Sequence, residues 1–316
     1  MSLNQYAQSL LNYRIWTNAY GVARTALALG LLLTLVFNNT DTLFRPGLLN
    51  DVSITKATIT QISLYKLVSL KTARWISVAV LLLVISGYFP RYTGILHWWV
   101  AFSFNASGVV VDGGDQINAI ATLLLIPISL ADKRRNHWQI EQEYSSSSFL
   151  RINAVCAYFF LRLQMSVLYF HAAVGKFKVT EWLDGTALYY WFSDPSIGMP
   201  PWLFDLMYYP LTNAYFITIL TWGVMIFEVS LAFALVMNLK MRRRFLWPAI
   251  FFHFMIIVSH GLVSFFFGML GGLIIYLYPL QEPMRFPRWA WPFSAKASEQ
   301  PRDAEGSVGD GIPASA

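Results

Sequence analysis

Lys176 is the residue of this sequence whose surroundings best suit chemistry. It lies in "YFHAAVGKFKVTEWLDGTALYYW" (169–191), where an apolar run of about 25 residues ends. Two interpretations are open. The long stem of Lys176 reaches the membrane surface and anchors the helix end, or the amine stays in an apolar cavity, where loss of water favours its neutral, basic form. In the second interpretation, His171 and Asp115 are further candidates for catalysis.

Acidic residues also occur at membrane depth, where ionisable groups are costly and usually functional or internally paired. Glu228 lies in the middle of "WGVMIFEVSLAFALVM". Its carboxyl group is therefore either protonated or paired with a cation, and Arg24, Arg162 or a histidine are the structural candidates. Asp112 and Asp115 flank two glycines in "DGGD", which indicates either a plain turn at the outer interface or a helix start. In the latter case Asp115 begins the helix and faces a shared cavity.

Arg24 and the histidines have plainer interpretations. Arg24 lies in the first turns of the first span, and an interfacial anchor is the favoured interpretation over a functional role inside the membrane. His253 and His260 share a helix face but lie about 10 Å apart along the axis, too far for one zinc ion, whose ligands lie about 2 Å from it. Together with His97 and His171 they suit haem, although nothing in the spacing demands it. No metal site is predicted.

The composition predicts the kind of structure that holds these residues. Of 316 residues, 56% are hydrophobic and 13% charged, with a mean hydropathy of +0.48. Soluble domains carry roughly 25% charged residues, so much of this surface faces lipid. The net charge of +6 comes from basic residues at the ends of apolar segments, which indicates membrane topology rather than nucleic-acid binding. The lone cysteine, Cys156, excludes an intrachain disulfide.

The apolar segments predict an all-α, polytopic transmembrane bundle of about eight spans. A spanning helix needs about 20 mostly apolar residues. The candidate segments are 17–37, 72–89, 94–111, 115–131, 150–175, 211–237, 245–262 and 263–280.

Charge predicts the orientation of these spans. "DKRRNHW" (132–138) follows the fourth span and "KMRRR" (240–244) follows the sixth. An even number of crossings separates them, so both are expected in the cytoplasm, where positively charged loops concentrate. Both termini then also lie in the cytoplasm, and the polar "DGGD" lies outside.

The chain is predicted to divide into three parts. Residues 1–16 form a cytoplasmic segment, 17–280 the membrane domain, and 281–316 a cytoplasmic tail whose polar composition predicts disorder. Within the membrane domain, 38–71 is expected to form an extracytoplasmic loop. Residues 176–210, rich in Trp, Tyr and Pro, are expected to lie in the membrane interface.

Several long strings resemble the sporulation-delaying protein B family of bacterial integral membrane proteins. They include "GYFPRYTGILHWWVAFSFNAS", "VDGGDQINAIATLLLIPISLADKRRNHW", "EWLDGTALYYWFSDP" and "LTWGVMIFEVSLAFAL". The resemblance covers roughly residues 10–280. It implies a multi-pass protein of the bacterial cytoplasmic membrane that is required to mature a secreted peptide toxin. It also implies a peptide precursor and a small co-encoded protein as partners.

More distantly, the chain resembles the membrane domain of vitamin K-dependent gamma-glutamyl carboxylases, which are grouped with bacterial relatives as horizontally transferred transmembrane (HTTM) domains. The resemblance implies that Lys176 matches the lysine thought to deprotonate the hydroquinone cofactor. The match needs one inserted residue, the carboxylase uses a histidine near the position of Asp115, and its large extracytoplasmic domain is absent, so vitamin K carboxylation itself is not implied. The matching residues are Tyr169, Phe170, Ala172, Val174, Lys176, Trp182, Asp184 and Gly185.

Four functions remain open at this point. The leading one is a maturation factor for a secreted peptide, acting as an enzyme at the outer leaflet through a carboxylase-like or other peptide-modifying reaction. The second is a non-catalytic scaffold or chaperone for the precursor. The third is an oxidoreductase with a quinone-type cofactor, and the fourth is a peptide exporter. The sequence has no phosphate-binding glycine loop, no histidine–glutamate zinc motif and no glycine-flanked nucleophilic serine.

Overall fold

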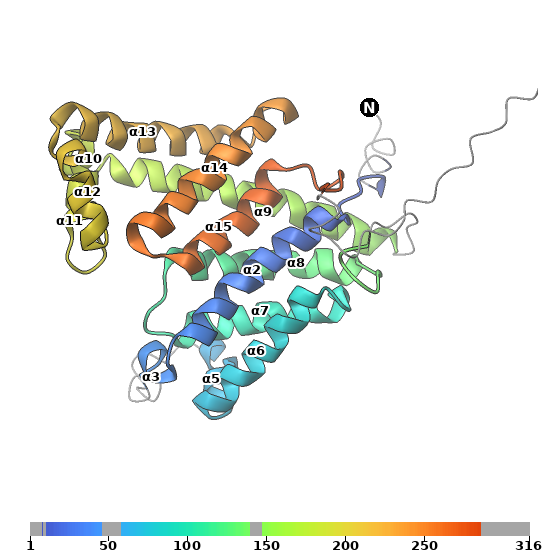
Figure 1. Ribbon diagram of the computed structural model, residues 1–316. Helices are drawn as coiled ribbons and strands as arrows, with labels where there is room; N and C mark the ends of the chain where they lie inside the picture. Colours follow the sequence, from blue (N-terminus) through green and yellow to red (C-terminus); the bar gives the residue numbers. More distant parts are fainter. Residues whose placement is uncertain (1–7, 9–10, 46–57, 140–146, 286–316) are drawn as a thin grey trace, which may run out of the picture. The chain divides into compact units, whose positions relative to one another are not determined.

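The computed structural model describes residues 8, 11–45, 58–139 and 147–285. These residues form α-helices and one 3-10 helix (Thr58–Ile62), and no strand beyond an isolated bridge between Tyr88 and Asn136. The helices, labelled in Figure 1, are α2 (Asn18–Phe37), α3 (Thr40–Leu43), α5 (Leu64–Leu67), α6 (Leu70–Ser86), α7 (Pro90–Ser107), α8 (Gly113–Ala131), α9 (Ser148–Lys176), α10 (Thr180–Leu183), α11 (Ala187–Ser193), α12 (Pro201–Thr212), α13 (Ala214–Phe233), α14 (Leu239–His260) and α15 (Val263–Leu277).

The all-α class is confirmed, and each of the eight predicted apolar segments coincides with a long helix: α2, α6, α7, α8, α9, α13, α14 and α15. By length and composition, α2, α8, α9 and α13 can cross a membrane, whereas the apolar α15 has only 15 residues. Apolar helices of this length indicate a membrane protein. The count of eight crossings stays a prediction.

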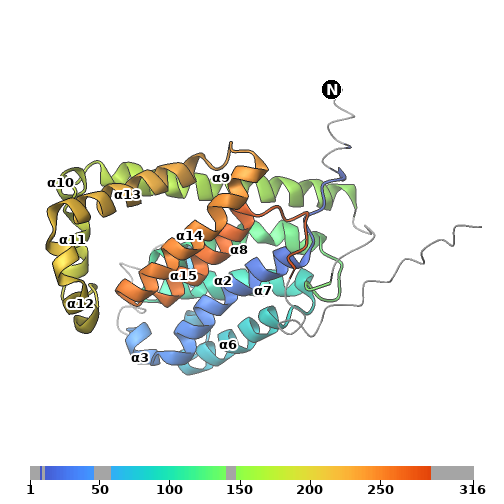
Figure 2. The same ribbon diagram turned by 45° about the horizontal axis from the view of Figure 1, so that its top comes forward.

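Helix α2 lies at the centre of the bundle, packed against α15 on one side and α6 on the other (Figures 1 and 2). This position overturns the prediction that Arg24 anchors α2 at the interface. Arg24 is 1% exposed, and its Nη2 donates a hydrogen bond of 2.7 Å to Oγ1 of Thr93 on α7. The Arg24 side chain therefore points toward α7 inside the bundle instead of reaching the membrane surface.

Helices α9 and α13 run antiparallel, side by side in both views (Figures 1 and 2). At one end, Nη2 of Arg162 lies 3.5 Å from the carbonyl oxygen of Leu235, just beyond α13. Further along α9, Nζ of Lys176 meets the carboxylate of Glu228. Arg162 is earlier in α9 than Lys176, but its partner Leu235 comes later in the chain than Glu228. The two helices therefore run in opposite directions, and the start of α9 points the same way as the end of α13.

Helices α8 and α9 are antiparallel too. Ile117, near the start of α8, shares a core cluster with Tyr169 near the end of α9, whereas Ile128, near the end of α8, shares another with Ala157. The segment after α8 and the start of α14 therefore lie at the same end, opposite Lys176. Both basic segments thus lie at one end of the bundle, and the prediction that this end faces the cytoplasm stays a prediction.

Reporter fusions after Asn136 and after Arg244 are expected to give the same, cytoplasmic signal, because both follow helices that end on one side of the bundle. A fusion near Pro200, between α11 and α12, is expected to report the opposite side. The measurement is paired alkaline phosphatase and fluorescent-protein activity, normalised to the amount of fusion protein. Opposite signals from the first two fusions would contradict this topology.

Three predicted segments are described only in part. In the loop 38–71, α3 and α5 come together where Phe44 stacks on Tyr65 with ring centroids 4.2 Å apart. Most of segment 1–16 and the tail after residue 285, for which disorder is predicted, lie outside the described residues.

Candidate functional site

Lys176 and Glu228 form a largely buried ion pair. Nζ of Lys176 lies 2.7 Å from Oε2 and 2.9 Å from Oε1 of Glu228, and it also donates to the carbonyl of Ala172 at 3.2 Å. The two side chains are 19% and 10% exposed. Glu228 is thus paired with Lys176 rather than with Arg24, Arg162 or a histidine, the partners considered from sequence.

The sequence of the two helices explains why these residues meet. Glu228 follows Thr221 and Met225 on the buried face of α13, at the spacing of one helix stripe, so its carboxylate points toward α9. Lys176 is the last residue of α9, where the helix dipole favours a cation. Two ionisable residues that face each other in an apolar bundle neutralise each other's charge.

Trp182 completes the surroundings of the lysine. Its ring centroid lies 5.0 Å from Nζ of Lys176, a cation–π distance. A tight turn after α10 holds the indole there, because Asp184 Oδ1 accepts hydrogen bonds from the backbone N–H and the hydroxyl of Thr186. Gly185 has φ of +85°, and a Cβ at this position would lie 2.7 Å from a Thr218 side-chain atom. The local chemistry of "EWLDGT" therefore positions Trp182.

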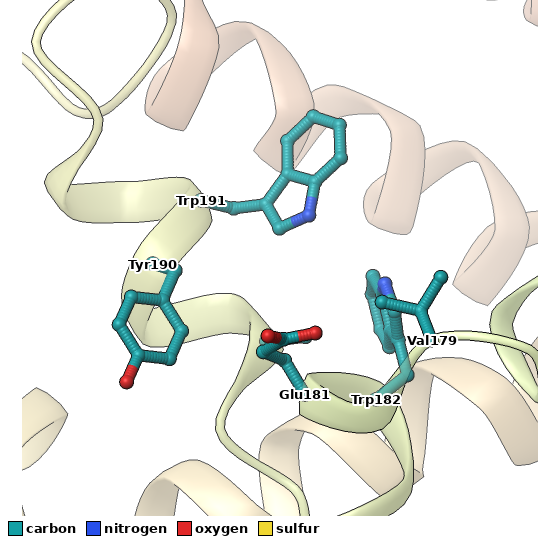
Figure 3. Close-up of a pocket in the computed structure, with 6 residues that line it drawn as sticks. Val179, Glu181, Trp182, Tyr190 and Trp191 are labelled. Atoms are coloured by element: carbon teal, nitrogen blue, oxygen red, sulfur yellow. The ribbon is translucent and has the colours of Figure 1, made fainter.

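A pocket of about 220 Å³ lies along this segment, and Trp182 both lines the pocket and contacts Lys176. Figure 3 shows the carboxylate of Glu181 between the indoles of Trp182 and Trp191. Among the described residues, Glu181 has no ion-pair partner. Aromatic walls with one carboxylate suit a cationic group. The pocket residues are Val179, Glu181, Trp182, Ala187, Tyr190 and Trp191.

His260 ties this segment to α14. Its Nδ1 donates to the carbonyl of Ile197 at 2.7 Å, and its ring meets Trp191 edge-on with centroids 6.3 Å apart. His253 instead is buried in the core, where Nδ1 donates to the carbonyl of Ala249 at 2.7 Å. His171 is exposed and contacts Phe170. Within the described ranges, no three His, Cys, Asp or Glu side chains gather as metal ligands do.

"DGGD" forms the start of α8. Asp112 is the N-cap and Asp115 the third helical residue, and each side chain accepts a hydrogen bond from the other's backbone N–H, as in a capping box. Asp112 also accepts a hydrogen bond of 2.7 Å from the hydroxyl of Ser264, the second residue of α15. Asp115 therefore lies in the first turn of a helix, but the helix begins two residues earlier than expected, at Gly113. Among the described contacts, none joins Asp115 to Lys176, so a shared cavity stays a prediction.

Sequence reasoning missed a buried polar cluster between α2, α7 and α8. The hydroxyls of Tyr20 and Ser129 are hydrogen-bonded at 2.7 Å beside Arg24. His137, in the segment after α8, is buried, and this burial, with Arg24 and Arg134 nearby, holds its pKa well below the ordinary value. His137 is therefore neutral at pH 7. The signal that could have revealed this cluster is that several consecutive apolar segments each contain polar residues, such as Tyr20 and Arg24 in one and Ser129 in another.

Comparison with known proteins gives two relatives. The chain is 38% identical over 276 residues, 86% of its length and 88% of the relative's, to the uncharacterized protein YitO of Bacillus subtilis (strain 168). It is 36% identical over 293 residues, 92% of its length and 90% of the relative's, to the sporulation-delaying protein SdpB of the same organism. Neither a family model nor a solved structure matches the chain.

Proposed function

This chain belongs to the family of the sporulation-delaying protein SdpB, and from that membership we propose that it is an integral membrane factor for the maturation of a secreted bacterial peptide toxin. The alignment, 36% identical, extends over about nine-tenths of both chains, so it covers most of the apolar helices. The peptide precursor and a small co-encoded protein are its proposed partners, and the bacterial cytoplasmic membrane is its proposed location.

The proposed reactive centre is the Lys176–Glu228 pair, and its 2.7 Å hydrogen bond is the observation that carries the proposal. A lysine that donates to a carboxylate is protonated and cannot accept a proton. Transfer of one proton from Nζ to Oε2 converts the ion pair into a neutral amine and a carboxylic acid. Both forms have the same total charge, so the transfer leaves no unpaired charge in apolar surroundings. The neutral amine of Lys176 is then a base.

The neighbouring pocket is the proposed docking site for the precursor. Glu181 supplies a negative charge, and Trp182 and Trp191 supply aromatic faces, so the pocket suits a lysine or arginine side chain or an amino terminus. Because Trp182 touches both the pocket and Lys176, a peptide bound in the pocket lies beside the reactive centre. This geometry would bring one segment of the precursor to the base.

The distant resemblance to HTTM-type carboxylases supports the role of Lys176 as the base. The same resemblance keeps a quinone-type cofactor open as a further proposal. The chain offers no residue that we assign to a cofactor. The main competing function is a non-catalytic scaffold, in which the same ion pair only holds α9 to α13. An oxidoreductase that acts with a quinone is the third candidate.

Mass analysis of the secreted peptide separates these functions. Cells without this protein are expected to release no mature peptide, and Lys176→Met is expected to have the same effect because it removes both the base and the charge that neutralises Glu228. Lys178→Met is the matched control, since Lys178 is exposed and two residues away.

The mass of the peptide that accumulates identifies the missing reaction. A peptide with an unmodified mass in the Lys176→Met strain, at a normal amount of membrane-inserted protein, would support an enzyme. The mature mass at reduced amount would support a scaffold. Mature peptide at normal amount in the absence of the protein would contradict the proposed function.

A further inference from the structure

Two arginines interact electrostatically near the end of α13 that lies away from Lys176. Arg162 on α9 is 7% exposed, and Arg242 in the first turns of α14 is partly buried. The two guanidinium groups are close enough to repel each other electrostatically. Like charges brought together in a partly buried site destabilise the fold unless an anion lies between or beside them.

Several N–H groups of these two arginines have no acceptor in the part of the chain that the structure describes. They are Nε of Arg162 and both Nε and Nη1 of Arg242, all buried. Nη2 of Arg162 reaches only a backbone carbonyl, that of Leu235, at 3.5 Å. A buried donor without an acceptor costs free energy, and the cost is larger for a charged group. These donors therefore lack an acceptor that carries negative charge.

The described neighbours supply no such charge. The groups that act electrostatically on Arg242 are Arg162 and the hydroxyls of three tyrosines, Tyr13, Tyr158 and Tyr276. The guanidinium of Arg162 also lies over the ring of Tyr158, 5.8 Å from its centroid. The nearby carboxylate of Glu282 is paired with Arg243 instead. Within the described residues, the two positive charges thus remain uncompensated.

The start of α14 adds to the positive potential. Asn238 caps the helix, and the first turn contains no acidic residue, whereas Lys240, Arg242, Arg243 and Arg244 occur within the first six positions. A helix amino terminus is the positive end of the dipole, so cations there are unfavourable and anions are favoured. An anion beside Arg242 would interact favourably with the positive end of the helix dipole. It would also offset the repulsion between Arg242 and Arg162.

We propose that Arg162 and Arg242 bind the phosphate group of a membrane phospholipid between α9 and the start of α14. A phosphate group has several oxygens that accept hydrogen bonds from guanidinium N–H groups, and Nε of Arg162 with Nε and Nη1 of Arg242 are donors that lack such an acceptor. The site lies level with the end of α13, where membrane helices reach the headgroup layer. Exposed apolar side chains on both helices offer a surface for the acyl chains: Phe159, Phe160, Leu163, Trp247 and Phe251.

The expected effect is a lipid-dependent gain in stability. The full-length protein is purified in a neutral detergent, and its Tm is measured with added phosphatidylglycerol. The expected rise in Tm is about 5 °C. Arg242→Gln is expected to abolish the rise, and Arg244→Gln is the matched control because Arg244 is exposed and carries the same charge. Without lipid, Arg242→Gln is expected to be at least as stable as the wild type, because the repulsion is gone.

Further measurements with inorganic phosphate and with the variants identify the ligand. Inorganic phosphate at the same concentration is expected to have a much smaller effect than the lipid. An equal rise with phosphate, abolished by Arg242→Gln, would overturn a lipid as the occupant. If Arg242→Gln and Arg244→Gln respond to lipid as the wild type does, the site itself is overturned. Should Arg242→Gln fail to fold, Arg242→Lys is measured instead, and a lower lipid affinity is expected because lysine cannot bind phosphate through two N–H groups.

Discussion

Glu228→Gln is expected to lower the yield of folded protein strongly. The glutamine has nearly the same volume, but it leaves the ammonium group of Lys176 without its carboxylate in a site where the lysine side chain is only 19% exposed. Removal of one partner from a buried ion pair typically costs about 3–5 kcal/mol, which is a large part of the stability of most proteins. The measurement is the fraction of membrane-inserted protein that stays monodisperse in detergent, together with its Tm.

Two comparisons show whether the loss comes from the broken pair. The double variant Lys176→Met/Glu228→Leu removes both charges and is expected to recover most of the stability, because apolar residues often replace a buried pair without loss. Glu282→Gln is the matched control, since Glu282 is paired with Arg243 at the surface and the change should cost less than about 1 kcal/mol. Normal yield of Glu228→Gln would mean that the carboxyl group is protonated and that Lys176 does not depend on it.

The fold was predictable because membrane helices are encoded locally. About 20 apolar residues predict a span without knowledge of its neighbours, and all eight predicted segments are helices. The start of α8 was predictable for the same reason, since Asp112 and Asp115 cap it through bonds only three residues apart. The number of membrane crossings was not predictable in this way. A 15-residue helix such as α15 fits either inside a bundle or across a thin part of the membrane.

The partners of the polar residues could not be predicted, because they depend on which helices lie side by side. Lys176 and Glu228 are 52 residues apart, and both were recognised as unusual, but only the antiparallel packing of α9 and α13 pairs them. Arg24 was misplaced because its helix looks like any other apolar span, whereas its central position buries it. The pocket at Glu181 depends on the turn after α10 and on the contact of Trp191 with His260 of α14, which sequence spacing does not reveal.

Lys176→Arg is expected to abolish maturation of the peptide while leaving the protein folded. Arginine keeps the positive charge and can bind the carboxylate of Glu228 through two N–H groups, so the ion pair survives. A guanidinium group with a pKa above about 12 cannot give up its proton to act as a base at neutral pH. A general base typically contributes about 10²–10⁴ to the rate, so the rate of maturation should fall by about 100-fold or more.

The measurement is the amount of mature peptide per membrane-inserted protein, with Lys178→Arg as the control because Lys178 is exposed and near the site. The structure makes this substitution decisive, since a lysine that only joins α9 to α13 would be replaced by arginine with little loss. Loss of maturation in Lys176→Arg, at normal yield and Tm, therefore indicates proton transfer rather than packing. Full activity would end the catalytic interpretation of Lys176 and favour a scaffold, because the charge and the pairing would then be all that the function requires.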